Sequence, residues 1–156
     1  MLKNINHNIN TKRLESQARD MDGYEIFSDP KSGTVLHNML IKKNVTGYAA
    51  DLTEEFRKIL GIEIRPRFLI QKKGYTLPFH TDRGTTCAVN FILSTSRDPI
   101  RFETDTGYSS YQYKQAIVDV SQRHEVTALK EDRYLFKLSI FDLDYNEVIK
   151  RYDSAH

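Results

Sequence analysis

A chain of 156 residues with 39% hydrophobic and 28% charged side chains has the size and composition of one water-soluble domain with its own core. The 23 basic and 21 acidic residues leave a formal charge of +2, which excludes bulk electrostatic attraction to nucleic acid or to an acidic membrane surface. The single cysteine, Cys87, excludes an internal disulfide, and the chain shows neither a secretory leader nor a run near the ~18 apolar residues of a membrane span, so we expect a cytoplasmic protein.

The first 43 residues combine a polar segment with a predicted strand pair. Residues 1–22 are rich in asparagine and charge, which predicts an arm or a short surface helix, and we expect a single domain over residues 23–156. Between Gly23 and Lys43, apolar patches flank the turn-forming run SDPKSG. This pattern predicts two short strands joined by a turn.

A helix is predicted next. Thr46 is a residue type that favours the N-cap, and Gly61 supplies a stop signal. Between them the apolar residues recur at helical spacing, at Leu52, Phe56, Ile59 and Leu60.

After Gly61 the apolar period changes from about four to two, which is typical of strands. The runs are bounded by Gly, Pro, Ser, Thr or Asp and cover 62–71, 87–94, 99–102, 108–114, 116–120 and 133–142. One helix before many short strands predicts a mainly β sandwich or barrel with an N-terminal helical buttress, rather than a parallel βαβ sheet.

The run FHTDRG, residues 79–84, places His80 and Asp82 between two apolar stretches with one residue separating them. On a strand, residues i and i+2 project from the same face, so an imidazole and a carboxylate can reach one point. The alternative is a surface turn with an Asx-type hydrogen bond. Two ligands do not hold a metal ion firmly, so the metal hypothesis needs a third.

His124 is the best candidate for that third ligand. Of the others, His7 lies in the polar arm, His156 is the last residue, and His37 has no acidic companion. The segment from Asp82 to His124 is long enough for about three or four strands that return the chain to its starting point in a double-sheet fold. Two histidines and one carboxylate suit non-haem Fe(II), whose open positions admit a cosubstrate and dioxygen. The alternative for His124 is a hydrogen-bonded residue at a strand end.

The last predicted strand begins at Arg133. One of its faces carries Arg133, Leu135, Lys137 and Ser139, and the other carries Tyr134, Phe136, Leu138 and Ile140. The two cations therefore point either to solvent or into a cavity. A planar guanidinium is suited to bidentate binding of a carboxylate, as an oxoacid chelating iron would require at its far end.

The pattern HTD followed by HEVTALKEDRYLFKLSIFD resembles the Fe(II)/2-oxoglutarate-dependent oxygenases. The triplet His124-Glu125-Val126, with Arg133 nine residues after His124, is similar to the prolyl-hydroxylase branch. The run FILSTSRDPIRFETDTG also resembles the aspartyl/asparaginyl β-hydroxylase-like group, so both branches stay open. The resemblance covers about residues 62–142.

This resemblance implies a double-stranded β-helix, also called a jelly roll, of the cupin-like kind. It implies Fe(II) held by His80, Asp82 and His124, and 2-oxoglutarate held by Arg133. It further implies hydroxylation of a prolyl or other residue in a protein or of a free amino acid, with succinate and carbon dioxide as co-products and ascorbate as an additional reductant. The expected partners are 2-oxoglutarate, dioxygen and the substrate, with no nucleic acid and no membrane.

Three further residues are candidates for the cosubstrate pocket. Lys137 stands four residues after Arg133, where many relatives of this resemblance carry a threonine or serine, and it points either to the cavity or to solvent. Asn90 is polar within the apolar run CAVNFIL, so it either contacts the cosubstrate or bonds to a neighbouring loop. Tyr75 falls in RFLIQKKGYTLPFHTD, which resembles the strand that enters the metal site.

A second function class also fits the sequence. A catalytically silent, cupin-like barrel that binds a metal or a small acid would keep the fold and the ligands, but it would have no need of Arg133. Cys87 is expected to be a small buried hydrophobe, and the tyrosines at 108, 111 and 113 are expected to cover the sheet.

Overall fold

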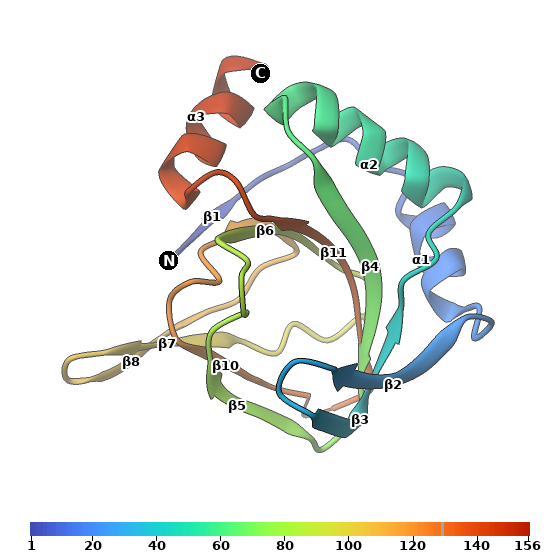
Figure 1. The fold of residues 1–156 in the computed structure, drawn as a ribbon, viewed down its shortest axis with the longest axis vertical. Helices are drawn as coiled ribbons and strands as arrows, with labels where there is room; N and C mark the ends of the chain where they lie inside the picture. The colour runs from blue at the N-terminus through green and yellow to red at the C-terminus, as the bar shows by residue number, and fades with distance from the viewer. Residues whose placement is uncertain (129) are drawn as a thin grey trace.

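A computed structural model describes residues 1–128 and 130–156 of the chain as two facing antiparallel sheets with helices on one side (Figure 1). The larger sheet contains, in spatial order, β1 (Leu2–Asn4), β9 (Gln115–Val118), β6 (Cys87–Ile92), β11 (Arg133–Ile140), β4 (Ile64–Gln71), β3 (Thr34–Lys42) and β2 (Tyr24–Asp29). The smaller sheet contains β5 (Thr76–His80), β10 (His124–Thr127), β7 (Ile100–Thr104) and β8 (Gly107–Tyr111). The helices are α1 (Thr11–Arg19), α2 (Gly47–Leu60) and α3 (Tyr145–Ser154).

From β4 onwards the chain passes repeatedly between the two sheets. Strands β4, β6, β9 and β11 belong to the larger sheet, while β5, β7, β8 and β10 belong to the smaller one. Every strand pairing is antiparallel. This winding is a double-stranded β-helix, so the predicted fold class is confirmed.

The two faces of β11 differ because its residues alternate between two environments. Phe136 and Leu138 are 0% exposed and belong to the main apolar cluster, which also contains Phe56 of α2. On the opposite face Arg133 and Lys137 point between the sheets, where they line a cavity. Since β11 has β4 on one side and β6 on the other, its polar face is held in place by a fully paired strand with an apolar back.

The predicted helix and hairpin at the start of the domain are confirmed. Helix α2 ends at Gly61, which adopts φ +67°, a conformation that glycine takes readily. Thr46 is the N-cap residue, but its side chain makes no capping bond; the side-chain oxygen of Gln17 accepts a hydrogen bond from the Ala49 N–H instead, at 2.8 Å. Strands β2 and β3 form the hairpin, which turns through Gly33 at φ +72°.

Residues 1–22 pack against the rest of the chain through a strand and a helix. Strand β1 pairs with β9, and α1 places Leu14 and Ala18, both 0% exposed, in the main apolar cluster. His7 is buried between the C-terminal helix and α2, where its Nδ1 contacts the Tyr152 hydroxyl at 3.1 Å. In the part of the chain that is described, no helix is long and apolar enough to cross a membrane.

Candidate metal centre

Two histidines and one aspartate meet between the sheets. Strands β5 and β10 are neighbours, and their register sets His80 opposite His124. One possible ligand atom from each of His80, Asp82 and His124 lies within 4.8 Å of the others. The Nε2 atoms of His80 and His124 lie 3.2 and 3.3 Å from Oδ1 of Asp82.

Asp82 does not lie on a strand, so that part of the sequence interpretation was wrong. Strand β5 ends at His80, and Asp82 belongs to the turn that follows. Its backbone N–H donates to the Val120 carbonyl at 3.1 Å, which ties the turn to the segment just before His124. The carboxylate therefore reaches the histidines because of this tether rather than because of strand periodicity.

The orientation of the imidazoles favours metal binding. The Nδ1 atoms of His80 and His124 each lie 2.7 Å from a backbone carbonyl oxygen, of Pro78 and Gln122 respectively. A carbonyl oxygen only accepts, so each Nδ1 carries a proton, and a neutral ring then directs its Nε2 lone pair at Asp82. Three such acceptors repel one another unless a cation lies among them or the rings are protonated. Two imidazole nitrogens and one carboxylate are also the donor set that suits non-haem Fe(II), so the residues present fit this metal.

Lys137 of β11 provides a cation next to this cluster. Its ammonium forms an ion pair with Oδ2 of Asp82, and the two side chains are only 12% and 14% exposed. Burial raises the pKa of Asp82, but the charge of Lys137 and, when the imidazoles are protonated at Nε2, their hydrogen bonds and charge together outweigh it, and the pKa lies well below its usual range. Asp82 is therefore an ionised ligand candidate, and Lys137 points into the cavity rather than to solvent.

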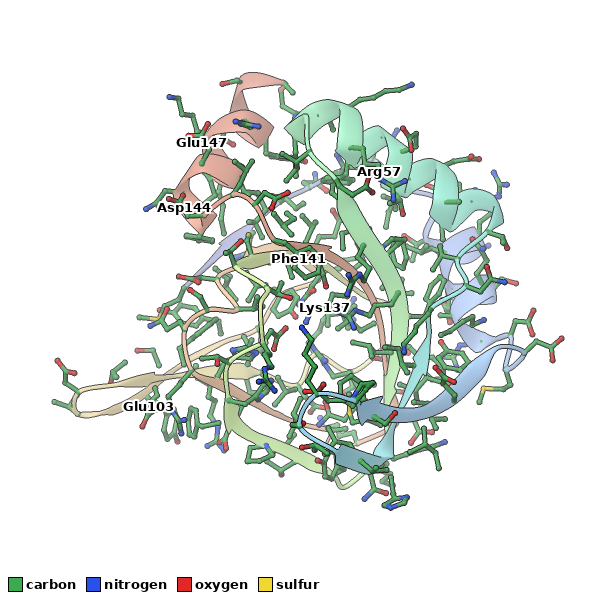
Figure 2. The ribbon with its side chains drawn as sticks, viewed as in Figure 1. Arg57, Glu103, Lys137, Phe141, Asp144 and Glu147 are labelled. Carbon is green, nitrogen blue, oxygen red and sulfur yellow. The ribbon has the colours of Figure 1, made fainter. Side chains whose placement is uncertain are left out.

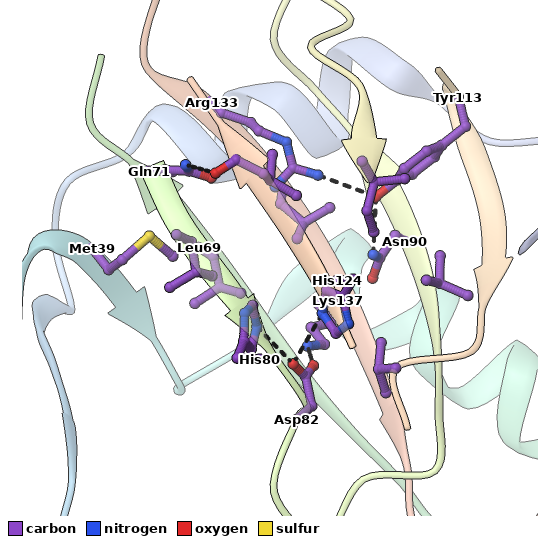
Figure 3. Close-up of a pocket in the computed structure, with 16 residues that line it drawn as sticks. Met39, Leu69, Gln71, His80, Asp82, Asn90, Tyr113, His124, Arg133 and Lys137 are labelled. Carbon is purple, nitrogen blue, oxygen red and sulfur yellow. Dashed lines mark hydrogen bonds and ion pairs between the residues drawn. The ribbon is translucent and has the colours of Figure 1, made fainter. Parts of the chain in front are cut away.

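A narrow cavity of about 60 Å³ runs from this cluster into the protein. In Figure 3 Arg133, Tyr113 and Gln71 lie at one end, His80, Asp82, His124 and Lys137 lie at the other, and Asn90 lies between the two groups. Arg133 is only 8% exposed. Its Nη2 and the Nδ2 of Asn90 both donate to the Tyr113 hydroxyl, at 3.1 and 3.0 Å.

The inner end of the cavity has unused hydrogen-bonding capacity. The Nε of Arg133, the Oδ1 of Asn90 and the Oε1 of Gln71 are buried without a hydrogen-bond partner. Buried polar atoms without partners are costly, so this end is suited to a polar ligand. The apolar side chains of Leu69 and Leu135 line the cavity together with these groups.

The structure brings most of the predicted site residues into one cavity. His80, Asp82, His124, Arg133, Lys137 and Asn90 all line it. Tyr75 is not among the described residues that line the cavity; its contribution is its carbonyl, which accepts from the Gln71 side-chain amide at 2.8 Å.

Sequence reasoning missed Tyr113 and Gln71. Tyr113 lies just before β9, outside any strand, so no periodicity indicated which way it points. Gln71 is 2% exposed and is paired in register with Arg133. The one available signal was a polar residue at the end of the apolar run FLIQ.

No protein-family model matches the chain, and no curated protein matches it. Solved structures do match. A prolyl hydroxylase from Trichoplax adhaerens, in complex with a peptide fragment of the oxygen degradation domain of hypoxia inducible factor, is 11% identical; the match covers 100% of this chain and 86% of that one, with a TM-score of 0.70. The fold is that of the prolyl hydroxylases.

Two bacterial structures share the prolyl-hydroxylase fold. A prolyl-4-hydroxylase from Pseudomonas putida is 15% identical over 83% of this chain and 84% of that one, with a TM-score of 0.59. An oxidoreductase of the 2OG-Fe(II) oxygenase family from Burkholderia pseudomallei is 14% identical over 82% and 76%, with a TM-score of 0.56. The resemblance to the prolyl-hydroxylase branch is thus confirmed at the level of the fold.

Proposed function

We propose that this chain is an Fe(II)- and 2-oxoglutarate-dependent dioxygenase that hydroxylates a prolyl or other residue in a peptide or protein, or a free amino acid, with succinate and carbon dioxide as co-products. The observation that carries the proposal is the pairing, within one cavity, of a two-histidine, one-carboxylate cluster with the buried guanidinium of Arg133. The single buried thiol, Cys87, supports a reducing compartment, so we place the reaction in the cytoplasm.

The metal would be held by the Nε2 atoms of His80 and His124 and by a carboxylate oxygen of Asp82. When bound, Fe(II) supplies the redox chemistry with dioxygen, and ascorbate is the reductant that would keep it ferrous. The protein keeps the imidazoles in one orientation through the Pro78 and Gln122 carbonyls, so the ligands need no rearrangement.

The inner end of the cavity would bind the distal carboxylate of 2-oxoglutarate. Arg133 offers the cation and its unpartnered Nε, and the Tyr113 hydroxyl stands beside it at 3.1 Å from Nη2. The leucines at 69 and 135 separate this group from the metal cluster and exclude water. At ~10–15 Å³ for each water, the cavity has room for only a few waters, which is too little for a five-carbon diacid. Lys137, which lines the cavity, would therefore move away from Asp82 as the diacid enters.

The substrate assignment rests on the likeness to prolyl hydroxylases. The Trichoplax protein is in complex with a peptide, which supports a peptide or protein substrate here. A free amino acid remains the second substrate class, in line with the sequence resemblance to small β-hydroxylase-like proteins.

Succinate release is the direct test. The protein is incubated with Fe(II), 2-oxoglutarate and ascorbate against a panel of amino acids and prolyl peptides, and metal–oxoacid binding is followed without oxygen through the weak visible charge-transfer band. We expect the band and substrate-dependent succinate in the parent chain, and neither in His80→Ala or Asp82→Ala. Failure to form the band at saturating 2-oxoglutarate would refute the assignment.

Arg133→Ala tests the oxoacid end separately. Loss of a charge-assisted, bidentate contact costs ~1.5–3 kcal/mol, so the half-saturating 2-oxoglutarate concentration should rise by roughly ten- to a hundredfold while metal binding stays the same. Arg13→Ala is the matched control, because Arg13 stacks over Tyr48 at 4.8 Å on the helical side of the molecule. An unchanged requirement in Arg133→Ala would assign the carboxylate to Lys137 instead.

A further inference from the structure

The cavity-facing side of β4 and β11 continues beyond the metal cluster. In register, Lys137 is opposite Arg67, and the next position on this face sets Ser139 opposite Arg65. Since residues i and i+2 share a face, Arg65 and Arg67 lie on the same side of β4 as Leu69, which lines the cavity. Two arginines therefore extend the cavity-facing side past the proposed iron site.

The exposure of the cationic side chains increases in this direction along the face, although Ser139, which also lies on it, is 0% exposed. Arg133 is 8% exposed, the Lys137 side chain is 12% exposed, Arg67 is half-buried, and Arg65 is exposed. In Figure 2 the Lys137 side chain lies between β4 and the smaller sheet, and Phe141 lies further along, at the end of β11. The exposed guanidinium of Arg65 thus marks the end of this face that solvent reaches.

Arg67 has a buried donor that has no partner among the described residues. Its Nη2 donates to the Ser139 hydroxyl at 3.2 Å, whereas its Nε is buried without a partner. Burial lowers the pKa of this guanidinium; the charge of Asp82 opposes that effect and the charge of Arg65 adds to it. Asp82 itself is held by Lys137. Among the described residues no carboxylate forms an ion pair with Arg67, although arginine remains a cation even here.

Arg65 is a second cation without an ion pair in the described part of the chain. Its guanidinium lies over the Phe141 ring, with the central carbon 4.7 Å from the ring centre. This stacking fixes the side chain on the cavity-facing side. Two neighbouring guanidiniums repel each other, and an anion between them would remove that cost.

The anion at these arginines cannot be the cosubstrate's distal carboxylate. Lys137 stands four positions after Arg133 on β11, which is roughly 13 Å of strand at about 3.3 Å per residue. The proposed oxoacid spans the stretch between Arg133 and the metal cluster beside Lys137, and Arg67 lies across from Lys137 at the cluster end. A ligand of Arg67 and Arg65 therefore belongs to the other reactant.

We propose that Arg67, with Arg65 beside it, binds a carboxylate of the hydroxylated substrate. This inference rests on the function proposed above and narrows its substrate class to molecules with a negative charge near the reacting carbon. The carboxylate is either the α-carboxylate of a free amino acid or an acidic side chain next to the target residue in a peptide. Arg67 is then a specificity-determining residue, because desolvated guanidinium donors favour an anionic partner over a neutral amide.

Two matched probe sets distinguish the sources of the carboxylate. The first compares free L-amino acids with their C-terminal amides. The second compares amidated prolyl peptides that carry Asp or Glu beside the target with the same peptides carrying Asn or Gln. Substrate-dependent succinate release gives the KM for each probe, and calorimetry with Zn(II) and N-oxalylglycine bound gives affinity without turnover. We expect stimulation and binding by the carboxylate member of one set, and about ten- to a hundredfold weaker binding of its amide partner.

Variants of the arginines complete the test. Arg67→Met should raise the KM of the carboxylate probe to that of its amide, with the half-saturating 2-oxoglutarate concentration unchanged, and Arg67→Lys should restore part of the preference. Arg13→Met, which removes a stacked surface arginine, should behave as the parent chain. Urea unfolding checks that Arg67→Met remains folded.

Three results would overturn the inference. They are equal use of amide and carboxylate probes, an unchanged carboxylate KM in Arg67→Met, and a normal anaerobic charge-transfer band with no stimulation by any probe. In each case the proposed dioxygenase function stands. If the band itself does not form, the proposed function fails first, and the substrate inference falls with it.

Discussion

The ion pair between Lys137 and Asp82 leads to a quantitative prediction for Lys137→Met. Both side chains are nearly buried, at 12% and 14% exposed, and the ammonium is the cation that contacts the carboxylate. Removing one partner of a buried pair costs ~3–5 kcal/mol, because the remaining charge is left without compensation. Met keeps the unbranched chain, so packing changes little. Because both side chains keep some exposure to solvent, we expect the lower end of this range, about 3 kcal/mol of lost stability in the metal-free protein.

The same loss should appear as a gain in metal affinity. A divalent cation replaces the ammonium at Asp82, so the metal-bound variant loses little, while the metal-free reference state is raised by about 3 kcal/mol. At about 1.4 kcal/mol per factor of ten, the affinity for Mn(II) or Zn(II) should rise roughly a hundredfold. Urea unfolding without metal and calorimetric titration with metal measure the two halves of this cycle.

The control is Lys43→Met, which removes an ion pair with Glu25 whose side chains are 62% and 63% exposed. Exposed pairs contribute ~0–1 kcal/mol, so this variant should change neither quantity. Equal metal affinities in Lys137→Met and the parent chain would refute the reasoning, whatever the stability of the variant. Such a result would mean that the ammonium does not compete with the metal for Asp82.

Three further predictions concern other parts of the molecule. Tyr113→Phe removes the hydroxyl that Arg133 and Asn90 share, and we expect the half-saturating 2-oxoglutarate concentration to rise about tenfold; an unaltered value would exclude Tyr113 from the oxoacid site. Phe136→Ala empties a fully buried position and should cost ~3–5 kcal/mol in urea unfolding, whereas a loss below 1 kcal/mol would contradict the packing described. Burial raises the pKa of the Cys87 thiol from 9.0 to about 12, so a disulfide reagent at pH 8 should label Cys87 only when the protein unfolds. Between pH 9 and pH 12 the thiol ionises in the unfolded chain but not in the folded one. The free energy of unfolding should therefore fall as the pH rises above about 9. Immediate labelling of the native protein would count against that burial.

The sequence predicted secondary structure best in elements where the pattern of polar and apolar residues matches the surroundings of each face. On β11 one face is apolar throughout and the other carries Arg133 and Lys137, and this difference separated the core face from the cavity face, because that strand has both faces covered. Helix α2 was predicted for a similar reason, since its apolar stripe faces the sheet and Gly61 ends it in a left-handed conformation. In both elements local pattern and tertiary packing agree.

Helix α1 was one of two alternatives expected for residues 1–22, and helix α3 was not predicted; in both segments the local sequence pattern carries little information. Helix α1 buries only Leu14 and Ala18, and α3 buries only Val148 and Tyr152. Two apolar positions in a short polar helix give a weak periodic signal, and what holds these helices is contact with distant parts of the chain. The same holds for Tyr113, whose hydroxyl reaches Arg133 from outside any strand.

The metal hypothesis depended on placing Asp82 on the same strand as His80, and the structure shows that this placement was wrong. Strand geometry was expected to align His80 with Asp82, but Asp82 lies in a turn that the Val120 carbonyl holds beside His124. The contact between residues distant in sequence could not be predicted from the spacing of His80 and Asp82. The convergence of the three groups is therefore a property of the double-sheet winding, which brings β10 back beside β5.

The position of β11 explains why the exposure of the cationic side chains increases from one end of the site to the other. The strand is anchored by core side chains such as Phe136 and Leu138, so Arg133, Lys137 and the arginines across from its outer half stand at fixed depths. Under the proposed function, each depth would serve a different group: the buried guanidinium of Arg133 a cosubstrate carboxylate, the ammonium of Lys137 the Asp82 carboxylate until a metal replaces it, and the half-buried and exposed guanidiniums of Arg67 and Arg65 the incoming reactant. Groups carried on a rigid, paired strand can separate two anionic ligands in this way, whereas side chains on mobile loops could bind either one. Register, rather than loop closure, is then what would keep cosubstrate and substrate apart in this chain.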